Sequence, residues 1–294
     1  MHILMNWNPL SMLSSEQPFP VIDLYITGNC NFRCPYCFGE DVNKGDISEE
    51  IFCRVVKFAD YCNTSIGFTG GEPLLHNNFR KLVEIATNEE VPIILRTNGM
   101  LIADFLDVLG SFEWIGVSID GATNSTVKRM RPSSSLYSYR ESEKWLRPMN
   151  NIQLINKLYP NVKVLLASLV SSFNTPSLIA LARMIKESEL SIDKWKLYQL
   201  TRNNFRSLNT SSKYEIEEDS ITELSLVLGD YFDGEIVCKV GDGNCLLVDT
   251  NGLVRVNSII VGSIFEENSE LERKIRRLDA YGNININKIK TYHV

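Results

Sequence analysis

Three cysteines lie close together near the start of this 294-residue chain. Three residues separate Cys30 from Cys34 and two separate Cys34 from Cys37, so one short loop can bring the three thiols to one centre. Thiolates are soft ligands that suit zinc or an iron–sulfur cluster. A structural zinc ion normally takes four ligands, whereas three cysteines around a cubic cluster leave one iron open to an exogenous ligand. The motif therefore favours an iron–sulfur cluster with one open iron.

Two other interpretations of these cysteines stay open at this point. Cys34-Pro35-Tyr36-Cys37 alone is typical of a dithiol redox site of the glutaredoxin type. That interpretation leaves Cys30 unexplained, and the chain is several times too long for that fold. The other interpretation is a plain zinc knuckle. A disulfide framework is not indicated, because the chain has 7 cysteines, an odd number, and three of them are crowded together.

A second polar motif, Gly70-Gly71-Glu72-Pro73, follows the second predicted strand. The two glycines allow the backbone to approach a charged ligand closely. Glu72 offers a carboxylate that can accept hydrogen bonds from an ammonium group. Without the cysteines this motif would indicate only a turn, but beside them it favours a binding role.

The elements that carry these motifs alternate between strand and helix. Six predicted strands, rich in β-branched, aromatic and aliphatic residues, cover 21–27, 64–69, 91–97, 114–119, 162–170 and 194–200. Helices are predicted from the N-cap Ser48 onward, over 78–89 and 101–109, within 137–157 around Pro148, and from a Thr175 cap with Pro176 in the first position. This alternation predicts an α/β fold of parallel strands joined by helical crossovers, either doubly wound or a partial barrel.

The pattern changes after residue 200. A polar, loop-like stretch covers 202–212, and helices are predicted over 217–228 and 266–279. Residues 245–249 and 253–257 form a predicted hairpin around Asn251-Gly252. The predicted organisation is an N-terminal segment (1–20), a core (21–200) and a C-terminal extension (201–294) packed on that core.

The polar residues are concentrated where the predicted strands end. In parallel α/β folds, ligands bind at the carboxyl ends of the strands, where the following loops share one face. Six segments are therefore expected to converge on one site: 30–37, 70–73, 97–99, 118–121, 171–174 and 199–204.

Composition narrows the class of protein further. The chain has 30 Lys and Arg against 36 Asp and Glu, a net charge of −6, which argues against a nucleic acid polymer as partner. No apolar run approaches the roughly 20 residues needed to cross a bilayer. The stretch from Met1 to Glu16 lacks a basic head and is interrupted by Pro9, so it does not indicate a secretory signal. We therefore expect a cytoplasmic protein with no membrane partner.

The cysteine motif after the first strand, followed by Gly-Gly-Glu-Pro after the second, resembles the radical S-adenosylmethionine (radical SAM) superfamily. The resemblance covers residues 21–200. It implies a partial (β/α)6 barrel, with the residues beyond as a small α+β C-terminal extension. It also implies that Cys30, Cys34 and Cys37 hold a [4Fe–4S] cluster, whose open iron chelates the amino and carboxylate groups of S-adenosylmethionine.

The same resemblance implies cofactor-binding roles at other strand ends. Gly70, Gly71, Glu72 and Pro73 match the motif that hydrogen-bonds the methionyl amino group. Tyr36 matches the aromatic position that lies against the adenine. Thr97 and Asn98 match residues near the methionine and ribose groups, and Ser118 and Asp120 occupy the next strand end.

The activity implied is reductive cleavage of S-adenosylmethionine. An electron enters the cluster, the sulfonium C–S bond breaks, and a 5′-deoxyadenosyl radical abstracts a hydrogen from the substrate. The cofactors carry this chemistry, while the protein supplies orientation and excludes water. The implied partners are a small-molecule substrate and a reducing electron donor of the flavodoxin or ferredoxin type.

The segment Trp195–Gln199 resembles the corresponding segment of viperin-like enzymes, which dehydrate nucleoside triphosphates. Lys196 and Tyr198 share one face of the sixth strand, and Lys196 with Arg202 can bind phosphate at the barrel mouth. The candidate substrate-binding residues are Lys196, Tyr198, Gln199 and Arg202. In the alternative interpretation Lys196 is a solvated strand-end charge and Trp195 packs against a helix.

Other features favour a different substrate. Ser118–Ala122 with Arg129–Pro132 is more similar to the peptide-modifying and cofactor-maturing branches of the superfamily. The alternative function is therefore modification of a short peptide. Cys238 and Cys245 are too few for an auxiliary cluster bound by cysteine alone, so burial is their expected role. A cluster-bearing scaffold or sensor without activity is the third hypothesis, and the intact Gly70–Pro73 motif argues against it.

Overall fold

The computed structural model of the chain describes residues 21–37, 45–140, 142–188, 190–200, 212–239, 246–256 and 259–280. The described strands form one open sheet in the order β10-β9-β8-β1-β2-β3-β4-β5-β6-β7. Their bounds are β1 (Val21–Thr27), β2 (Ser65–Gly70), β3 (Ile93–Thr97), β4 (Trp114–Ser118), β5 (Lys163–Leu169), β6 (Lys194–Tyr198), β7 (Glu235–Lys239), β8 (Leu246–Val248), β9 (Leu253–Val256) and β10 (Ile259–Ser263).

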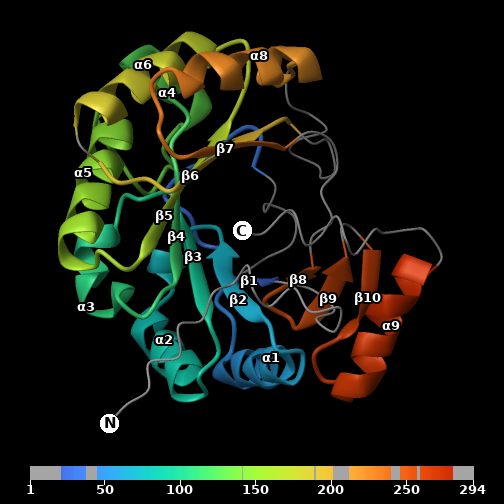
Figure 1. The fold of residues 1–294 in the computed structure, drawn as a ribbon. Helices are drawn as coiled ribbons and strands as arrows, with labels where there is room; N and C mark the ends of the chain where they lie inside the picture. Colours follow the sequence, from blue (N-terminus) through green and yellow to red (C-terminus); the bar gives the residue numbers. More distant parts are fainter. Residues whose placement is uncertain are drawn as a thin grey trace.

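Helices connect the first six strands and cover the outer face of the curved sheet (Figure 1). The described α-helices are α1 (Glu49–Tyr61), α2 (Phe79–Asn88), α3 (Leu106–Leu109), α4 (Asn124–Met130), α5 (Glu143–Leu158), α6 (Thr175–Glu187), α8 (Glu218–Gly229) and α9 (Asn268–Ala280). Short 3-10 turns cover Pro73–Leu75, Ile102–Phe105 and Ser212–Tyr214. None of these helices is long and apolar enough to span a membrane.

The predicted α/β partial barrel is confirmed. Strands β1 to β6 pair in chain order and all run parallel, as the strand–helix alternation requires. The N-cap is also confirmed at α1, where the Ser48 side chain accepts a hydrogen bond from the Ile51 backbone N–H.

The two faces of the sheet differ because side chains alternate along each strand. The outer face packs against the helices in one large apolar core that includes Ile22, Phe68 and Leu95. The opposite face, which we call the inner face, carries Val21, Ile94 and Trp114 in a small separate apolar cluster with Leu165 against it. Charged residues lie on the same inner face, closer to the carboxyl ends of the strands.

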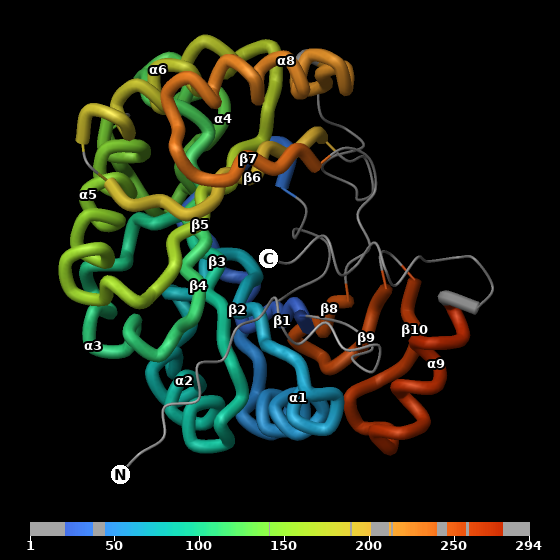
Figure 2. The backbone as a smooth tube through the Cα atoms, viewed as in Figure 1, coloured from blue at the N-terminus to red at the C-terminus, as the bar shows by residue number. Residues whose placement is uncertain are grey.

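The C-terminal residues extend this sheet at both edges. β7 pairs in parallel with β6, and β8 pairs in parallel with β1. The predicted hairpin is confirmed as antiparallel β8 and β9, and β10 adds a further antiparallel strand. Figure 2 shows these C-terminal strands lying on the two sides of the core strands. The division at residue 200 stays a prediction, since a shared sheet does not decide whether the core folds alone.

Several local predictions were incomplete or wrong. Helix α4 and strands β7 and β10 were not predicted, because each is short and only weakly periodic. The N-cap of α6 is Asn174 rather than Thr175, which leaves Pro176 in the second helical position. The predicted helix over 101–109 begins as a 3-10 turn and becomes α-helical only at Leu106. Residues 1–20 and 202–211 lie outside the described parts of the chain.

Candidate active site

The cysteine loop leaves the carboxyl end of β1 and is held on two sides by backbone hydrogen bonds. On one side, the Gly28 N–H donates to the Gly45 carbonyl at 2.8 Å. On the other, the Arg33 N–H donates to Pro132 at 2.8 Å, and the Ser134 N–H donates to Asn31 at 3.0 Å. The loop that follows α4 therefore lies directly against the cysteine loop and fixes its path.

The three thiols lie within electrostatic range of one another. A charge on Cys37 raises the pKa of both Cys30 and Cys34. Burial is the larger effect and raises the pKa of each of these two thiols to about 12, while the Arg131 guanidinium opposes the rise. The Cys37 N–H donates to the Cys34 carbonyl at 3.1 Å and closes a turn that brings the last two cysteines together.

The Gly-Gly-Glu-Pro loop packs against the base of the cysteine loop. The Gly71 N–H donates to the Thr27 carbonyl at 2.8 Å and the Glu72 N–H donates to Asn29 at 2.7 Å. A Cβ at Gly70 would lie 2.4 Å from the Thr27 oxygen, and one at Gly71 would lie 2.2 Å from the Asn29 oxygen. Both glycines therefore let two backbone segments touch, and their expected close approach to a charged ligand stays a prediction.

Glu72 is fully buried and holds the end of β3. Its carboxylate accepts hydrogen bonds from the Thr97 hydroxyl at 2.6 Å, the Asn98 N–H at 2.8 Å and the Leu74 N–H at 3.2 Å. Burial raises the pKa of this carboxyl to about 7, and the three donors counteract the rise. The Asn98 side chain in turn donates to the Asn31 side chain at 2.6 Å, so these hydrogen bonds link Glu72 to the cysteine loop.

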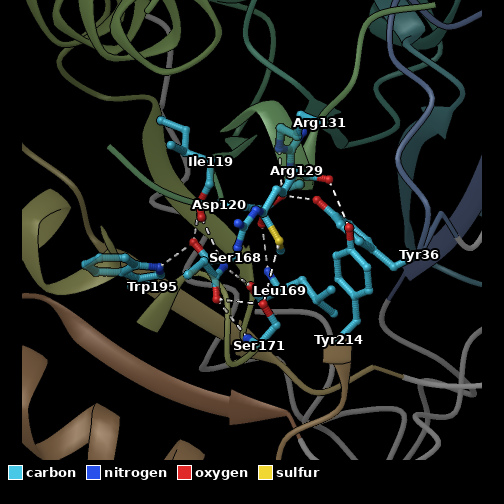
Figure 3. Close-up of polar contacts among 12 residues, drawn as sticks. Tyr36, Ile119, Asp120, Arg129, Arg131, Ser168, Leu169, Ser171, Trp195 and Tyr214 are labelled. Atoms are coloured by element: carbon cyan, nitrogen blue, oxygen red, sulfur yellow. Dashed lines mark hydrogen bonds and ion pairs between the residues drawn. The ribbon is translucent and has the colours of Figure 1, made fainter. Parts of the chain in front are cut away.

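A second buried network anchors the cysteine loop from the opposite side (Figure 3). The Tyr36 hydroxyl donates to Asp120 Oδ2, and Arg131 Nε lies 2.7 Å from the same oxygen. The other oxygen of Asp120 accepts a hydrogen bond from the Leu169 N–H at 2.8 Å. Asp120 thereby joins the end of β4 to the end of β5 and to the cysteine loop. Ser118 stands two residues before it, on the inner face of β4.

Residues that sequence reasoning missed complete this network. Tyr214 packs against Tyr36 with ring centroids 5.7 Å apart, and against Phe173 at 5.2 Å. Its hydroxyl donates to the Arg129 carbonyl at 3.0 Å. Arg131 was noted only as part of a family-like motif, although its charge reaches Cys30 and Cys34. Tyr214 lies far along the chain, so no local sequence signal could place it here.

The candidate substrate-binding residues of β6 fall into two groups. Lys196 is buried at 3% exposure on the inner face, so the interpretation as a solvated strand-end charge is wrong. Trp195, on the opposite face, is fully buried, packs edge-on against Phe232 and donates to the Ser168 hydroxyl at 3.0 Å. Tyr198 shares the inner face with Lys196.

The remaining two candidates are placed differently. The Gln199 side chain donates to the Ile216 carbonyl at 2.8 Å, which directs it toward the C-terminal segment. Arg202 and Cys245 lie outside the described residues. Cys238 is partly rather than fully buried and packs against the outer apolar core.

Comparison with known proteins agrees with this geometry. Residues 24–155 match the family model described as the Radical SAM superfamily. An S-adenosylmethionine-dependent nucleotide dehydratase of Selenomonas ruminantium is 25% identical over 191 residues, which are 61% of this chain and 65% of that protein. One from Flammeovirga pacifica is 31% identical over 140 residues, 44% of this chain and 48% of that protein. The matched region thus spans less than two thirds of each of these relatives.

Solved structures share the fold at low sequence identity. SuiB of Streptococcus suis, in a crystal structure with S-adenosylmethionine, aligns with a TM-score of 0.66 at 13% identity over 92% of this chain and 72% of SuiB. Native anSMEcpe, with AdoMet and the Cp18Cys peptide bound, aligns with a TM-score of 0.68 at 17% identity over 88% of this chain and 82% of that chain.

An open parallel α/β barrel with a three-cysteine loop at the end of its first strand defines a class of cluster-dependent proteins. The chain resembles the radical SAM superfamily over residues 24–155, which hold both the cysteine motif and the Gly-Gly-Glu-Pro motif. The cofactors of that superfamily are a [4Fe–4S] cluster and S-adenosylmethionine.

The donor set fits such a cluster. The three thiols on this loop interact electrostatically, and the charge of the buried Arg131 guanidinium acts on Cys30 and Cys34. Among the residues that the structure describes, no three His, Cys, Asp or Glu side chains gather as around a single metal ion. A cubic cluster binds each thiolate through a different iron, so its ligands need not meet at one point.

Proposed function

We propose that this protein is a radical SAM enzyme acting on a nucleotide. When bound, the cluster supplies an electron that cleaves S-adenosylmethionine, and the resulting 5′-deoxyadenosyl radical removes a hydrogen atom from the substrate. The observation that carries the nucleotide assignment is the charge on the inner face. Lys196 is buried there, and burial lowers its pKa to about 7 with help from the charges of Arg96, Lys239 and Lys194, while Asp23 opposes them. Such a surface suits the phosphates of a nucleotide.

Each residue of the site has a proposed role in this reaction. Cys30, Cys34 and Cys37 would hold the cluster. Gly70, Gly71, Glu72 and Pro73 would bind the methionyl amino group, and Thr97 and Asn98 would lie near the methionine and ribose. Tyr36 would lie against the adenine, with Asp120 holding its hydroxyl and Ser118 beside it. Lys196, Tyr198, Gln199 and Arg202 would contact the substrate.

The relatives' names and the charge of the inner face favour a nucleotide over a peptide. Two relatives are named as nucleotide dehydratases, whereas the solved structures of similar fold include proteins with peptide bound. Peptide modification is kept as the second candidate because those structures align over most of this chain. The cations of the inner face favour the nucleotide over the peptide as substrate, since they complement a polyanion better than a short uncharged peptide.

The experiment is anaerobic reconstitution of the full chain with iron and sulfide, followed by reduction. We expect about four irons per chain and release of 5′-deoxyadenosine on addition of dithionite, S-adenosylmethionine and a nucleoside triphosphate. A panel of deuterated nucleotides and short peptides identifies the substrate by deuterium transfer into 5′-deoxyadenosine. The physiological reductant would be a flavodoxin- or ferredoxin-type protein, which can replace dithionite in the same assay.

Matched cysteine variants test the ligand assignment. Cys34→Ala should lose the cluster absorbance and EPR signal and all 5′-deoxyadenosine release. Cys53→Ala, on the half-exposed side of α1, should retain both. A Cys34→Ala protein with full iron content would remove that residue from the ligand set. Cluster-loaded wild-type protein that forms no 5′-deoxyadenosine with any substrate would instead favour a scaffold or sensor.

A further inference from the structure

An ion pair crosses the inner face of the barrel between two strands that are not neighbours. Arg96 on β3 donates to Asp23 on β1, and β2 lies between them. The Asp23 side chain is 8% exposed and the Arg96 side chain is 32% exposed. The carboxylate is therefore enclosed, while part of the guanidinium faces the open inner space.

A glycine on β2 provides the room for this pair. A Cβ at Gly67 of β2 would lie 2.8 Å from Asp23 Oδ1 and 3.7 Å from Arg96 Cζ. A Cβ at Gly116 of β4 would lie 3.8 Å from Arg96 Cγ. The strands on both sides of β3 thus carry glycine beside the Arg96 side chain, and at Gly67 an added Cβ would displace Asp23.

The surroundings of Arg96 are rich in positive charge. The charges of Arg96, Lys194 and Lys239 all act on buried Lys196, and Asp23 opposes them. Asp23 pairs with Arg96 and Glu235 lies 2.9 Å from Lys194, and an incoming anion would add to these partners of the cations. Nearer the amino ends of the strands the inner face carries Val21, Ile94 and Trp114 in contact, and the Lys194 ammonium lies 5.6 Å from the centroid of the Trp114 ring. An anion that enters the barrel would therefore stop at the level of Arg96 and Lys196.

We propose that Arg96 is a specificity-determining residue that binds the phosphate chain of the substrate, and that Asp23 orients its guanidinium for this task. The inference rests on the proposed nucleotide substrate and adds a residue that the sequence patterns did not indicate. A carboxylate on one edge of a guanidinium fixes its plane and directs its other edge. The planar fork then suits two oxygens of a phosphate better than a lysine ammonium would.

The test measures binding of inorganic tripolyphosphate to the anaerobic, cluster-loaded full chain by calorimetry. Arg96→Gln should weaken this binding at least about tenfold and reduce its dependence on salt, because one charged contact is lost. The matched control is Arg80→Gln, which breaks an exposed Arg–Asp pair of the same kind with Asp107 and should leave binding unchanged. Gly67→Ala should also weaken binding, because its Cβ displaces Asp23. Gly229→Ala, which meets no atom within 4 Å, should not.

Three results would overturn the assignment of Arg96. If the Arg96→Gln protein binds tripolyphosphate as the wild type does but melts at a lower temperature, the ion pair only stabilises the fold. Equal weakening by Arg96→Gln and Arg80→Gln would reduce the effect to net charge. Wild-type protein that binds no tripolyphosphate would leave no phosphate site at all. The proposed function fails separately, on absence of 5′-deoxyadenosine from wild-type protein, so Arg96-dependent binding without that product would retain the site and reject the reaction.

Discussion

At the scale of single residues, the site depends on charged groups held out of water. Glu72, Asp120 and Lys196 are each nearly inaccessible to solvent. The two carboxylates have hydrogen-bond donors directed at them. Burial and the charges of nearby cations lower the pKa of Lys196, while Asp23 opposes them, so burial of this lysine costs free energy when it is charged.

The buried lysine predicts a specific dependence of stability on pH. Burial and neighbouring cations lower the pKa of folded Lys196 from 10.5 to about 7. Between these values the unfolded lysine binds a proton that the folded one does not, so the free energy of unfolding rises with pH. The slope for one proton is at most about 1.4 kcal/mol per pH unit. Lys196→Met should remove this rise, as measured by urea unfolding at pH 7, 8 and 9.

The control for this prediction is Lys57→Met on the exposed side of α1. That variant should keep the wild-type pH profile. If Lys196→Met and wild type differ by the same free energy at all three pH values, Lys196 titrates like an exposed lysine and the electrostatic account of the inner face is wrong.

At the scale of elements, loops are positioned by strand ends through a few buried contacts. The cysteine loop is held by the Gly-Gly-Glu-Pro loop on one side and by the Asp120 network on the other. Ser168 of β5 links this strand to β6 and to the end of β4, since its hydroxyl donates to the Ile119 carbonyl and accepts from Trp195. Figure 3 shows these contacts of Ser168 close to the Asp120 network that holds Tyr36 of the cysteine loop.

Asp120 is the point at which this arrangement can be broken. Asp120→Asn removes the charge that compensates Arg131, whose side chain is 9% exposed. Leaving a buried charge without its partner costs about 3–5 kcal/mol. We expect a loss of that size in the free energy of unfolding, measured by urea denaturation. Asp107→Asn breaks an exposed ion pair with Arg80 and should cost less than about 1 kcal/mol. Equal losses in the two variants would mean that Arg131 does not depend on Asp120.

At the scale of the whole molecule, the C-terminal residues complete the sheet that carries the site. β7 covers the open edge of β6, and β8 covers the open edge of β1. Both covered strands are themselves part of the site, since the cysteine loop follows β1 and Lys196 lies on β6. The extension also contributes Tyr214, which packs on the cysteine loop.

Removal of the extension tests how far the core is independent. A chain ending at residue 200 should expose the edges of β1 and β6, and unpaired parallel strands are prone to aggregate. We expect loss of a cooperative urea transition and a shift to large species in size-exclusion chromatography. A monomeric product with a sharp transition would instead support the predicted domain of residues 21–200.

The sequence was sufficient for the parts of the molecule that local pattern controls. Apolar runs and helix signals predicted β1 to β6 in order, and the Cys30–Cys37 spacing with Gly70–Pro73 identified the superfamily. Short elements such as α4 and β10 escaped prediction because a few residues carry little periodic signal. Thr175 was one residue from the true cap because Thr and Asn both suit that position.

The sequence could not predict the roles of residues that depend on contacts between distant segments of the chain. The sequence by itself determined that three cysteines lie on one loop at the end of a parallel strand, because ligand spacing and strand order are local properties. Only the tertiary structure decided that Gly70 and Gly71 make room for Thr27 and Asn29. It alone placed Lys196 in the barrel rather than in water and paired Arg96 with Asp23. These depend on strand register and on which face of the sheet closes inward, and both are fixed by packing across the whole chain.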